Sequence, residues 1–408
     1  MSVAPDRADN AAGTPLALPL AGVRVVDFTR LLPGPWCTQM LADMGADVIK
    51  VEAPHVGDPS RHNPPRQREH SAYFASVNRG KRSVVLDLRA PAGLEAAQRL
   101  IARADIVIES FAVGVAARLA IDYDSARARK PDVIYCSITG FGQDGPLAAS
   151  PGHDLVVQAT TGVLGITGHG AMPAFQAADY AGGAFGVIAI LGALHRRHAT
   201  GEGAHLDIAM FDGLLAMSEI ALLGALARAG GQTGSPMLEV WGRNPRYCIY
   251  PTADGRFVAV SLLESRLWAR FCQAIGRNDL VFEERQDERH SDHGERAAHY
   301  REAIGGYCAG HAAAEIDRAM RAQDIPVSVV LTPDEALRGD HARARGMTHV
   351  EHDPHDGAVV RIGNPLERAG LASSHGRRPP PLLGEHTAEV LAELGLPVTS
   401  GGLVESTT

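Results

Sequence analysis

Short apolar runs rich in β-branched residues recur through the first 142 residues, and segments with helical spacing separate them. A short β-branched run bounded by turn residues is typical of a buried strand, whereas apolar residues three or four positions apart are typical of a helix. The expected strands are 22–28, 46–52, 83–88, 105–110 and 132–142, with helices at 37–45 and 91–104. Because strands and helices alternate, the first 142 residues predict an α/β domain with a parallel sheet.

From Asp179 onward the pattern predicts a long buried helix, a short strand at 205–210 and further helix. Residues 247–264 indicate two strands around the polar turn ADGR, and helical segments then cover 265–276 and 301–323. A strand that leads into a helix begins at 325, and a final helix is expected at 385–395. The expected organisation is a leader (1–17), a large lobe (18–228), a linker (229–245), a small α+β lobe (246–325) and a segment returning to the large lobe (326–408).

Composition narrows the class of protein. Hydrophobic residues make up 45% and charged residues 21% of the 408 residues, and the net charge is −8, so nucleic acid and anionic membranes are not expected partners. The five cysteines are scattered without a CxxC pair, which argues against a disulfide framework or a zinc site. No signal peptide and no run of about 18 apolar residues is recognisable, so we expect a cytoplasmic protein.

Several polar segments follow the expected strands. NRGKR (78–82), ESF (109–111) and GHD (152–154) each lie after or between strands, and ligands of open α/β sheets bind beyond the carboxyl ends of the strands. The first turn has LLPGPW in place of GxGxxG, so a dinucleotide fingerprint is missing. The sequence therefore predicts a ligand site at this edge without the usual phosphate cradle.

Two ionisable residues start an apolar run. His153 is a candidate general base, because histidine is readily poised for proton transfer near neutral pH; the plain alternative is a helix-terminal residue that hydrogen-bonds locally. Asp154 suits a helix N-cap better than a catalytic role.

Asp179 begins a second apolar run and is followed by Gly182-Gly183, which would permit close approach of a backbone or a ligand. Burial would raise the pKa of its carboxyl, and capping and catalysis are compatible there. Glu264 ends the strand VAVSLLE, and it would either cap the next helix or orient His153 from the small lobe.

The segments GVRVVDFTRLLPGPWCTQMLADMGADVIKVEAPHVGDPSR, NRGKRSVVLDL, ITGFGQDGP, GHD, ADYAGG and YPTADGRFVAVSLLE together resemble the family III coenzyme A transferases, from about Gly22 to Leu396. That family includes formyl-CoA transferase-like, carnitine CoA-transferase-like and α-methylacyl-CoA racemase members. The resemblance implies an interlocked homodimer in which each chain has a Rossmann-like large lobe and a smaller lobe. It also implies an acyl-CoA substrate, with coenzyme A as part of the substrate, no prosthetic group and no metal.

The resemblance places coenzyme A along the large lobe. The matching positions are Ala53, Leu86, Asp87, Leu88, Arg89, Ser110, Phe111, Ala112, Arg118, Gly152, Asp154, Leu155, Val156 and Val157. Many members have an arginine at the position of Ala53, so Arg61, Lys81 or Arg82 would have to replace its phosphate contact.

Two activities remain open at this stage. In the racemase members a GHD histidine and an aspartate form a two-base pair supported by a small-lobe glutamate, which matches His153, Asp179 and Glu264. That match favours epimerisation of 2-methylacyl-CoA thioesters by proton transfer at the α-carbon. The alternative is transfer of CoA between an acyl-CoA and a free carboxylic acid, with Asp179 as the nucleophile that becomes an aspartyl-CoA thioester. A third hypothesis is a CoA-binding protein without catalysis.

Overall fold

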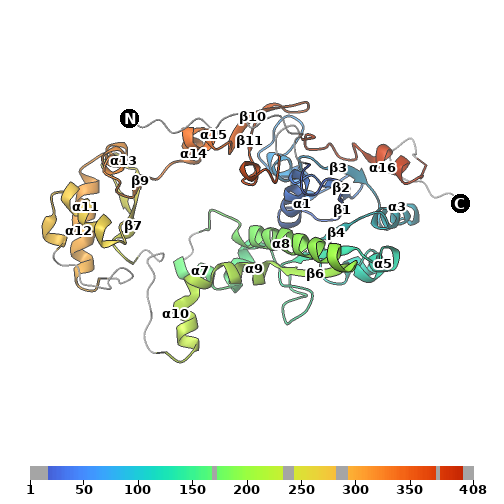
Figure 1. The fold of residues 1–408 in the computed structure, drawn as a ribbon, viewed down its shortest axis with the longest axis horizontal. Helices are drawn as coiled ribbons and strands as arrows, with labels where there is room; N and C mark the ends of the chain where they lie inside the picture. Colours follow the sequence, from blue (N-terminus) through green and yellow to red (C-terminus); the bar gives the residue numbers. More distant parts are fainter. Residues whose placement is uncertain (1–16, 168–171, 233–242, 282–292, 374–376, 398–408) are drawn as a thin grey trace. The chain divides into compact units, whose positions relative to one another are not determined.

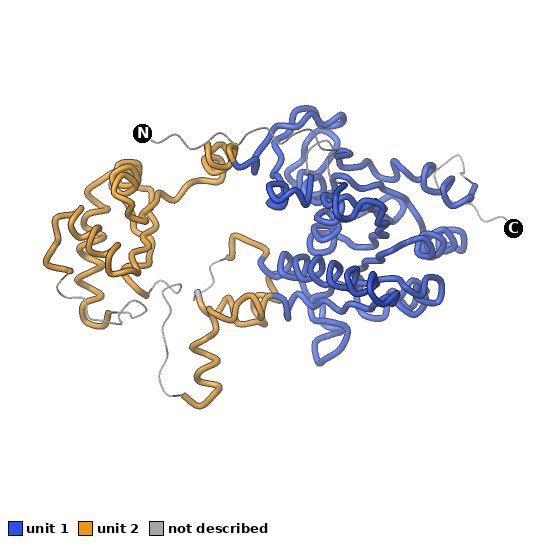
Figure 2. The backbone as a smooth tube through the Cα atoms, in the orientation of Figure 1, with its two compact units in different colours: residues 1–154, 177–213, 345–408 blue, residues 155–176, 214–344 orange. Residues whose placement is uncertain are grey.

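The computed structural model describes residues 17–167, 172–232, 243–281, 293–373 and 377–397, which fall into two compact units (Figure 2). Unit 1 combines residues 1–154, 177–213 and 345–408, and unit 2 combines 155–176 and 214–344. The expected leader, apart from residue 17, and most of the expected linker lie outside the described residues. The division into lobes at 228, 246 and 325 stays a prediction, and the units assign 155–176, 214–228 and 326–344 to unit 2.

Unit 1 is built on a six-stranded parallel sheet whose order is β3-β2-β1-β4-β5-β6 (Figure 1). The strands are β1 (Arg24–Asp27), β2 (Asp47–Glu52), β3 (Arg82–Val85), β4 (Ile106–Glu109), β5 (Ile134–Thr139) and β6 (Ala204–Ala209). This order reverses direction between β1 and β4, as in doubly wound dinucleotide-binding folds, and such a switch point opens a crevice at the carboxyl ends of the strands. The expected α/β fold with a parallel sheet is confirmed.

Helices cover both faces of this sheet, and the alternation of side chains along each strand explains how. Val25 packs with α1 (Pro33–Asp43) and α8 (Ala177–Thr200). The next residue, Val26, points to the opposite face, where the core includes residues of α3 (Pro91–Ile101). The remaining helices of unit 1 are α2 (Ala72–Asn78), α4 (Val115–Arg118), α5 (Tyr123–Arg129) and α16 (Thr387–Glu393).

Helix α8 corrects one expectation from the sequence. An 18-residue window of this 24-residue helix has a mean hydropathy of 1.6, so by length and composition the helix qualifies as a candidate membrane span, although no such run was expected. The bent pair α9 (Met210–Met217) and α10 (Glu219–Ala229) passes the same test when taken as one span. In unit 1, α8 packs against α1, β5 and β6, which is the environment of a core helix.

Unit 2 contains a three-stranded antiparallel sheet of β7 (Tyr247–Pro251), β8 (Phe257–Ser261) and β9 (Val327–Val329). Its core includes residues of α11 (Ser265–Ala274), α12 (Arg296–Ala309) and α13 (Ala313–Arg321). The expected helical stretch 301–323 is divided into two helices: α12 ends at Ala309, with Gly310 as its C-cap, and α13 begins at Ala313. The unit also holds α7 (Val163–Thr167), α14 (Pro333–Arg338) and α15 (Asp340–Ala344), and α6 (Asp154–Thr160) starts at the boundary.

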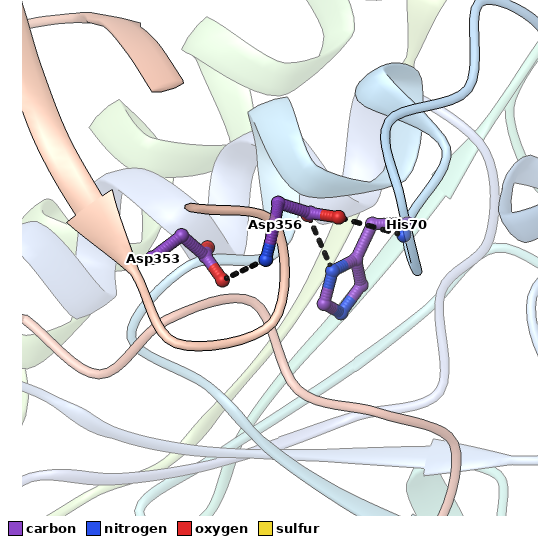
Figure 3. Close-up of side chains that lie close together, drawn as sticks. All are labelled: His70, Asp353 and Asp356. Atoms are coloured by element: carbon purple, nitrogen blue, oxygen red, sulfur yellow. Dashed lines mark hydrogen bonds and ion pairs between the residues drawn. The ribbon is translucent and has the colours of Figure 1, made fainter. Parts of the chain in front are cut away.

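A β-hairpin that the sequence reading missed belongs to unit 1. Strands β10 (Thr348–Asp353) and β11 (Gly357–Ile362) pair antiparallel, and their polar turn is tied to the loop before α2. The carboxylate of Asp356 accepts hydrogen bonds from the backbone N–H groups of Glu69 and His70, and it lies 2.7 Å from Nδ1 of His70. Figure 3 shows this contact and the bond from the Asp356 N–H to Asp353.

Candidate functional site

Two cavities open in unit 1 at the carboxyl ends of the sheet strands. A cavity of about 470 Å³ lies beyond β1, β2, β3 and β4, and we call it the distal cavity. A second cavity of about 450 Å³ lies beyond β1, β4 and β5, and it contains both His153 and Asp179, so we call it the carboxylate cavity. Both volumes fall within the range of small-molecule sites, and their position is the one that the strand order predicts.

The distal cavity gathers half of the positions proposed for coenzyme A. Its lining includes Ala53, Leu86, Asp87, Leu88, Arg89, Phe111 and Arg118. Ser110 and Gly152 line the carboxylate cavity instead, whereas Ala112 and the α6 residues Asp154, Leu155, Val156 and Val157 line neither. Arg89 and Arg118 bring two guanidinium groups to the lining of the distal cavity. The CoA assignments remain predictions, and the clustering supports seven of them.

The carboxylate cavity depends on hydrogen bonds that join Asp154 to residues 24 and 25 positions later in the chain. Oδ1 of Asp154 accepts from the backbone N–H of Ala178 at 2.8 Å and of Asp179 at 3.3 Å, so Asp154 caps the first turn of α8. Asp154 is therefore a helix cap, as expected, but it caps α8 and not α6, the helix that begins at Asp154. Since His153 precedes Asp154, this cap brings the GHD segment to the start of α8 and places His153 and Asp179 in one cavity.

The environment of Asp179 makes its carboxyl a weak acid. Burial raises its pKa to about 7, and the negative charge of Asp154 adds to the effect. Tyr73, on α2, lines the same cavity, and burial together with the charge of Asp179 raises the pKa of its phenol to about 12. The cavity therefore combines a carboxyl that titrates near neutral pH with a phenol that stays protonated and able to donate.

Close packing fixes the start of α8. A Cβ on Gly183 would lie 2.8 Å from the carbonyl oxygen of Pro33 and 2.8 Å from the Trp36 ring, and one on Gly182 would lie 2.8 Å from the Met210 side chain. The expectation that Gly182-Gly183 admits a close backbone is therefore confirmed. Because α8 touches α1 at Gly183 and α9 at Gly182, the start of α8, which carries Asp179, is held in place.

Glu264 lies in unit 2, at the N-cap position of α11, and its side chain makes no capping hydrogen bond. Its proposed support of His153 stays a prediction.

The three cations suggested as replacements for an arginine at Ala53 are all engaged within the protein. Arg61 forms a bidentate pair with Glu52, at 2.6 and 2.8 Å, and Arg82 pairs with Asp47, Glu389 and Glu393. Lys81 is fully buried, and its Nζ lies 3.2 Å from Asp27. A buried ion pair is costly to break, so these side chains serve the fold and the replacement hypothesis is not supported.

His70, Asp353 and Asp356 are a grouping with metal-ligand spacing in the described part of the chain. Asp356 is already held by His70 Nδ1, and Asp353 is held by Arg361 at 2.7 Å and by two backbone N–H groups. In Figure 3 the partnerless Nε2 of His70 points away from both carboxylates. The arrangement ties the hairpin to the loop before α2 and does not indicate a metal centre.

Three residues that line the cavities were not predicted from the sequence: Arg30, Asp58 and Tyr73. Each stands in a loop or short helix without a motif of its own, and only the TR of TRLLPGP directly after β1 offered a signal. Asp58 is fully buried beside Lys50, with Oδ2 2.9 Å from Nζ, and its Oδ1 accepts from the backbone N–H of Leu31 at 3.1 Å. It therefore fixes the loop that separates the two cavities.

Comparison with known proteins identifies the family of this chain. The profile of CoA-transferase family III matches residues 20–387. The chain is 36% identical to a succinate–glutarate CoA-transferase of Agrobacterium fabrum, over 92% of this chain and 96% of that protein. It is 33% identical to an acetyl-CoA:oxalate CoA-transferase of Acetobacter aceti, over 93% and 96%.

A solved structure shows the same fold. The crystal structure of a CAIB/BAIF family protein from Brucella suis is 30% identical, with a TM-score of 0.78 over 93% of this chain and 100% of that one. The family match covers nearly the whole chain, and the similar proteins of known name are CoA-transferases. The chain belongs to CoA-transferase family III.

Proposed function

We propose that this protein transfers coenzyme A from an acyl-CoA to a free carboxylic acid, with Asp179 as the nucleophile. The observation that carries the proposal is the position of Asp179: it is partly buried at the start of α8, in a cavity beyond the sheet, with a pKa of about 7. A carboxyl with such a pKa is substantially ionised at neutral pH and is more basic than an ordinary aspartate, which suits attack on a thioester.

The proposed cycle alternates two kinds of acyl intermediate. The Asp179 carboxylate attacks the thioester carbonyl and expels CoA thiolate, which leaves a mixed anhydride. The thiolate then attacks the aspartyl carbonyl, which releases the donor acid and leaves an aspartyl-CoA thioester. The acceptor carboxylate attacks that thioester, and the released thiolate attacks the acyl carbonyl of the second anhydride. Product acyl-CoA leaves and Asp179 is regenerated, so coenzyme A enters only with the substrate and no prosthetic group takes part.

Two side chains in the same cavity suit this cycle. The Tyr73 phenol, protonated at neutral pH, would donate to the oxyanion that forms on the attacked carbonyl. His153 would donate to the same oxygen or to a bound carboxylate, and this role replaces the proton abstraction expected of it in a racemase.

Epimerisation, the reading that the GHD histidine first favoured, finds no support among the similar proteins, whose names are CoA-transferases. A histidine beside a nucleophilic aspartate is also compatible with CoA transfer, so His153 does not decide between the two activities. The CoA-transferase names favour the alternative that the sequence left open.

The acid is proposed to be dicarboxylic. Succinate, glutarate, oxalate and mesaconate are all dicarboxylic acids, and they appear in the names of relatives that are 33–36% identical to this chain. The assembly is proposed to be a homodimer in the cytoplasm. Support for the dimer comes from an apolar face on the hairpin, where Val350, Val360 and Ile362 are each at least 60% exposed.

One assay separates the activities. The protein is incubated in D₂O with a single epimer of a 2-methylacyl-CoA, and in parallel with succinyl-CoA and glutarate. The proposal predicts glutaryl-CoA in the second reaction and no α-deuteration in the first, and Asp179→Asn should abolish transfer. Deuteration with epimerisation and without an acceptor acid would overturn the proposal in favour of the racemase.

A further inference from the structure

Arg30 lines both cavities of unit 1. It follows β1, at the point where the strand order reverses, so it stands where the two cavities adjoin. Among the described residues that line the carboxylate cavity, it is the only lysine or arginine. An anion that enters this cavity beside Asp179 therefore meets one permanent positive charge.

The backbone that carries Arg30 is fixed at several points. The N–H of Arg30 donates to the Ser110 hydroxyl at 3.1 Å, and the N–H of Leu31 donates to Asp58 at 3.1 Å. The ammonium of Lys50 donates to the carbonyl oxygen of Thr29 at 2.8 Å, and that ammonium is fully buried. Residues 29–31 thus form a preorganised support, anchored by a buried ion pair.

The side chain of Arg30, in contrast, is exposed. In the part of the chain that the structure describes, no carboxylate lies within ion-pair distance of its guanidinium, whose carbon lies 5.6 Å from the centre of the Phe111 ring. Arg61 and Arg82 in the same unit both have carboxylate partners. A guanidinium that has no carboxylate partner among the described residues and stands on a rigid support is suited to an oxyanion from outside, since its fork of donors matches a carboxylate.

We infer that Arg30 binds the second, unreacting carboxylate of a dicarboxylic acid while the first reacts at Asp179, and so determines acid specificity. The inference rests on the proposed function and names the residue behind the proposed substrate class. The same guanidinium chemistry would also fit the diphosphate of CoA. Arg89 and Arg118 line the distal cavity as well, whereas Arg30 is the single lysine or arginine among the described residues that line the carboxylate cavity, which favours the acid.

The test compares glutarate with pentanoate, a five-carbon acid that lacks the second carboxylate, with succinyl-CoA as donor. In a ping-pong cycle, kcat/KM for the acceptor reports only its reaction with the CoA-enzyme. We expect Arg30→Gln to lower kcat/KM for glutarate by about 10- to 100-fold. The value for pentanoate and the Kd of free CoA should change by less than about twofold, and Arg30→Lys should retain part of the preference.

Arg118→Gln is the matched control, because Arg118 lines the distal cavity only. It should weaken the binding of free CoA and leave the ratio of glutarate to pentanoate unchanged. Equal losses with both acids, a ratio that Arg30→Gln leaves unchanged, or weaker CoA binding at a constant ratio would each overturn the inference. The last of these outcomes would assign Arg30 to the CoA diphosphate.

A binding measurement keeps this test independent of the proposed chemistry. Glutarate and pentanoate are titrated by ligand-observed NMR against Asp179→Asn and against the double variant with Arg30→Gln. Loss of glutarate binding alone in the double variant supports the role of Arg30, even if the wild type transfers CoA to neither acid and the proposed function fails. Equal binding of glutarate to both proteins contradicts the role of Arg30.

Discussion

At the scale of single residues, the interactions of Asp154 explain both the position of Asp179 and part of its raised pKa. Asp154 holds the backbone N–H of Asp179 and at the same time raises the pKa of its carboxyl through negative charge. One side chain therefore both positions the proposed nucleophile and tunes it. Substitutions that separate these two roles give direct predictions.

Asp154→Asn keeps an oxygen that accepts from α8 and removes the charge. We expect the pKa of Asp179 to fall, and to stay above its ordinary value because burial, the larger cause of the shift, remains. Activity needs the ionised carboxylate, so kcat/KM of the wild type should rise with pH through about 7. The rising limb of the variant should lie at lower pH in a pH–rate profile. An unmoved limb would show that Asp154 does not tune Asp179.

Asp179→Asn should be inactive and more stable at alkaline pH. A carboxyl whose pKa is raised on folding costs no stability below the unfolded value of 3.8, and the cost is complete above about 7. Partial exposure limits the cost to about 2 kcal/mol. Thermal unfolding should show a higher Tm for the variant at pH 8 and an equal Tm near pH 4. A gain that is the same at both pH values would point to packing instead.

At the scale of elements, the contact between α1 and α8 decides where Asp179 stands. Sequence patterns located both helices and the glycine pair, because local apolar spacing and small residues leave a clear trace. They did not locate Arg30 or Asp58, since the contacts of these residues join positions 27 and 80 residues apart. They also missed the hairpin β10–β11, whose polar turn HDPHDG obscured two short alternating strands.

Gly183→Ala should separate α8 from α1, because its Cβ would lie 2.8 Å from the oxygen of Pro33 and from the ring of Trp36. We expect a loss of about 1–3 kcal/mol in the free energy of unfolding and a fall in kcat as Asp179 shifts. Gly192→Ala is the control on the same helix, where a Cβ meets nothing within 4 Å and stability should rise by up to about 1 kcal/mol. Denaturant unfolding measures the free energy of unfolding of both variants, and an equal change in the two would contradict the packing argument.

At the scale of the whole molecule, the parallel sheet and the α/β class followed from alternation in the sequence, and the family match agrees. The choice of activity did not follow. The match of His153, Asp179 and Glu264 to the racemase pattern suggested a racemase, because the sequence does not show the cavity around these residues. The cavity offers an aspartate, a phenol and an unpaired guanidinium, a set that suits reaction of a thioester with an acid.

The apolar face of the hairpin bears on assembly. Val350 pairs with Val360 across the two strands, and Ile362 lies beside them, all exposed in the single chain. An apolar face of this kind marks an interaction surface, and we expect it to be covered in a homodimer. Val360→Asp combined with Ile362→Asp should shift the protein to monomer in light scattering coupled to size exclusion, whereas Arg127→Asp on α5 should not. A wild type that is already monomeric would contradict the proposed dimer.

The most direct measurement of the central proposal is capture of the covalent intermediate on Asp179. The protein is mixed with succinyl-CoA without an acceptor acid, quenched with hydroxylamine, digested and analysed by mass spectrometry, with Asp179→Asn alongside. Aspartyl thioesters and anhydrides both yield a hydroxamate, so we expect a hydroxamate at Asp179 in the wild type. This hydroxamate should form only when the acyl-CoA is present. An unmodified Asp179 in protein that turns over an acyl-CoA would contradict it.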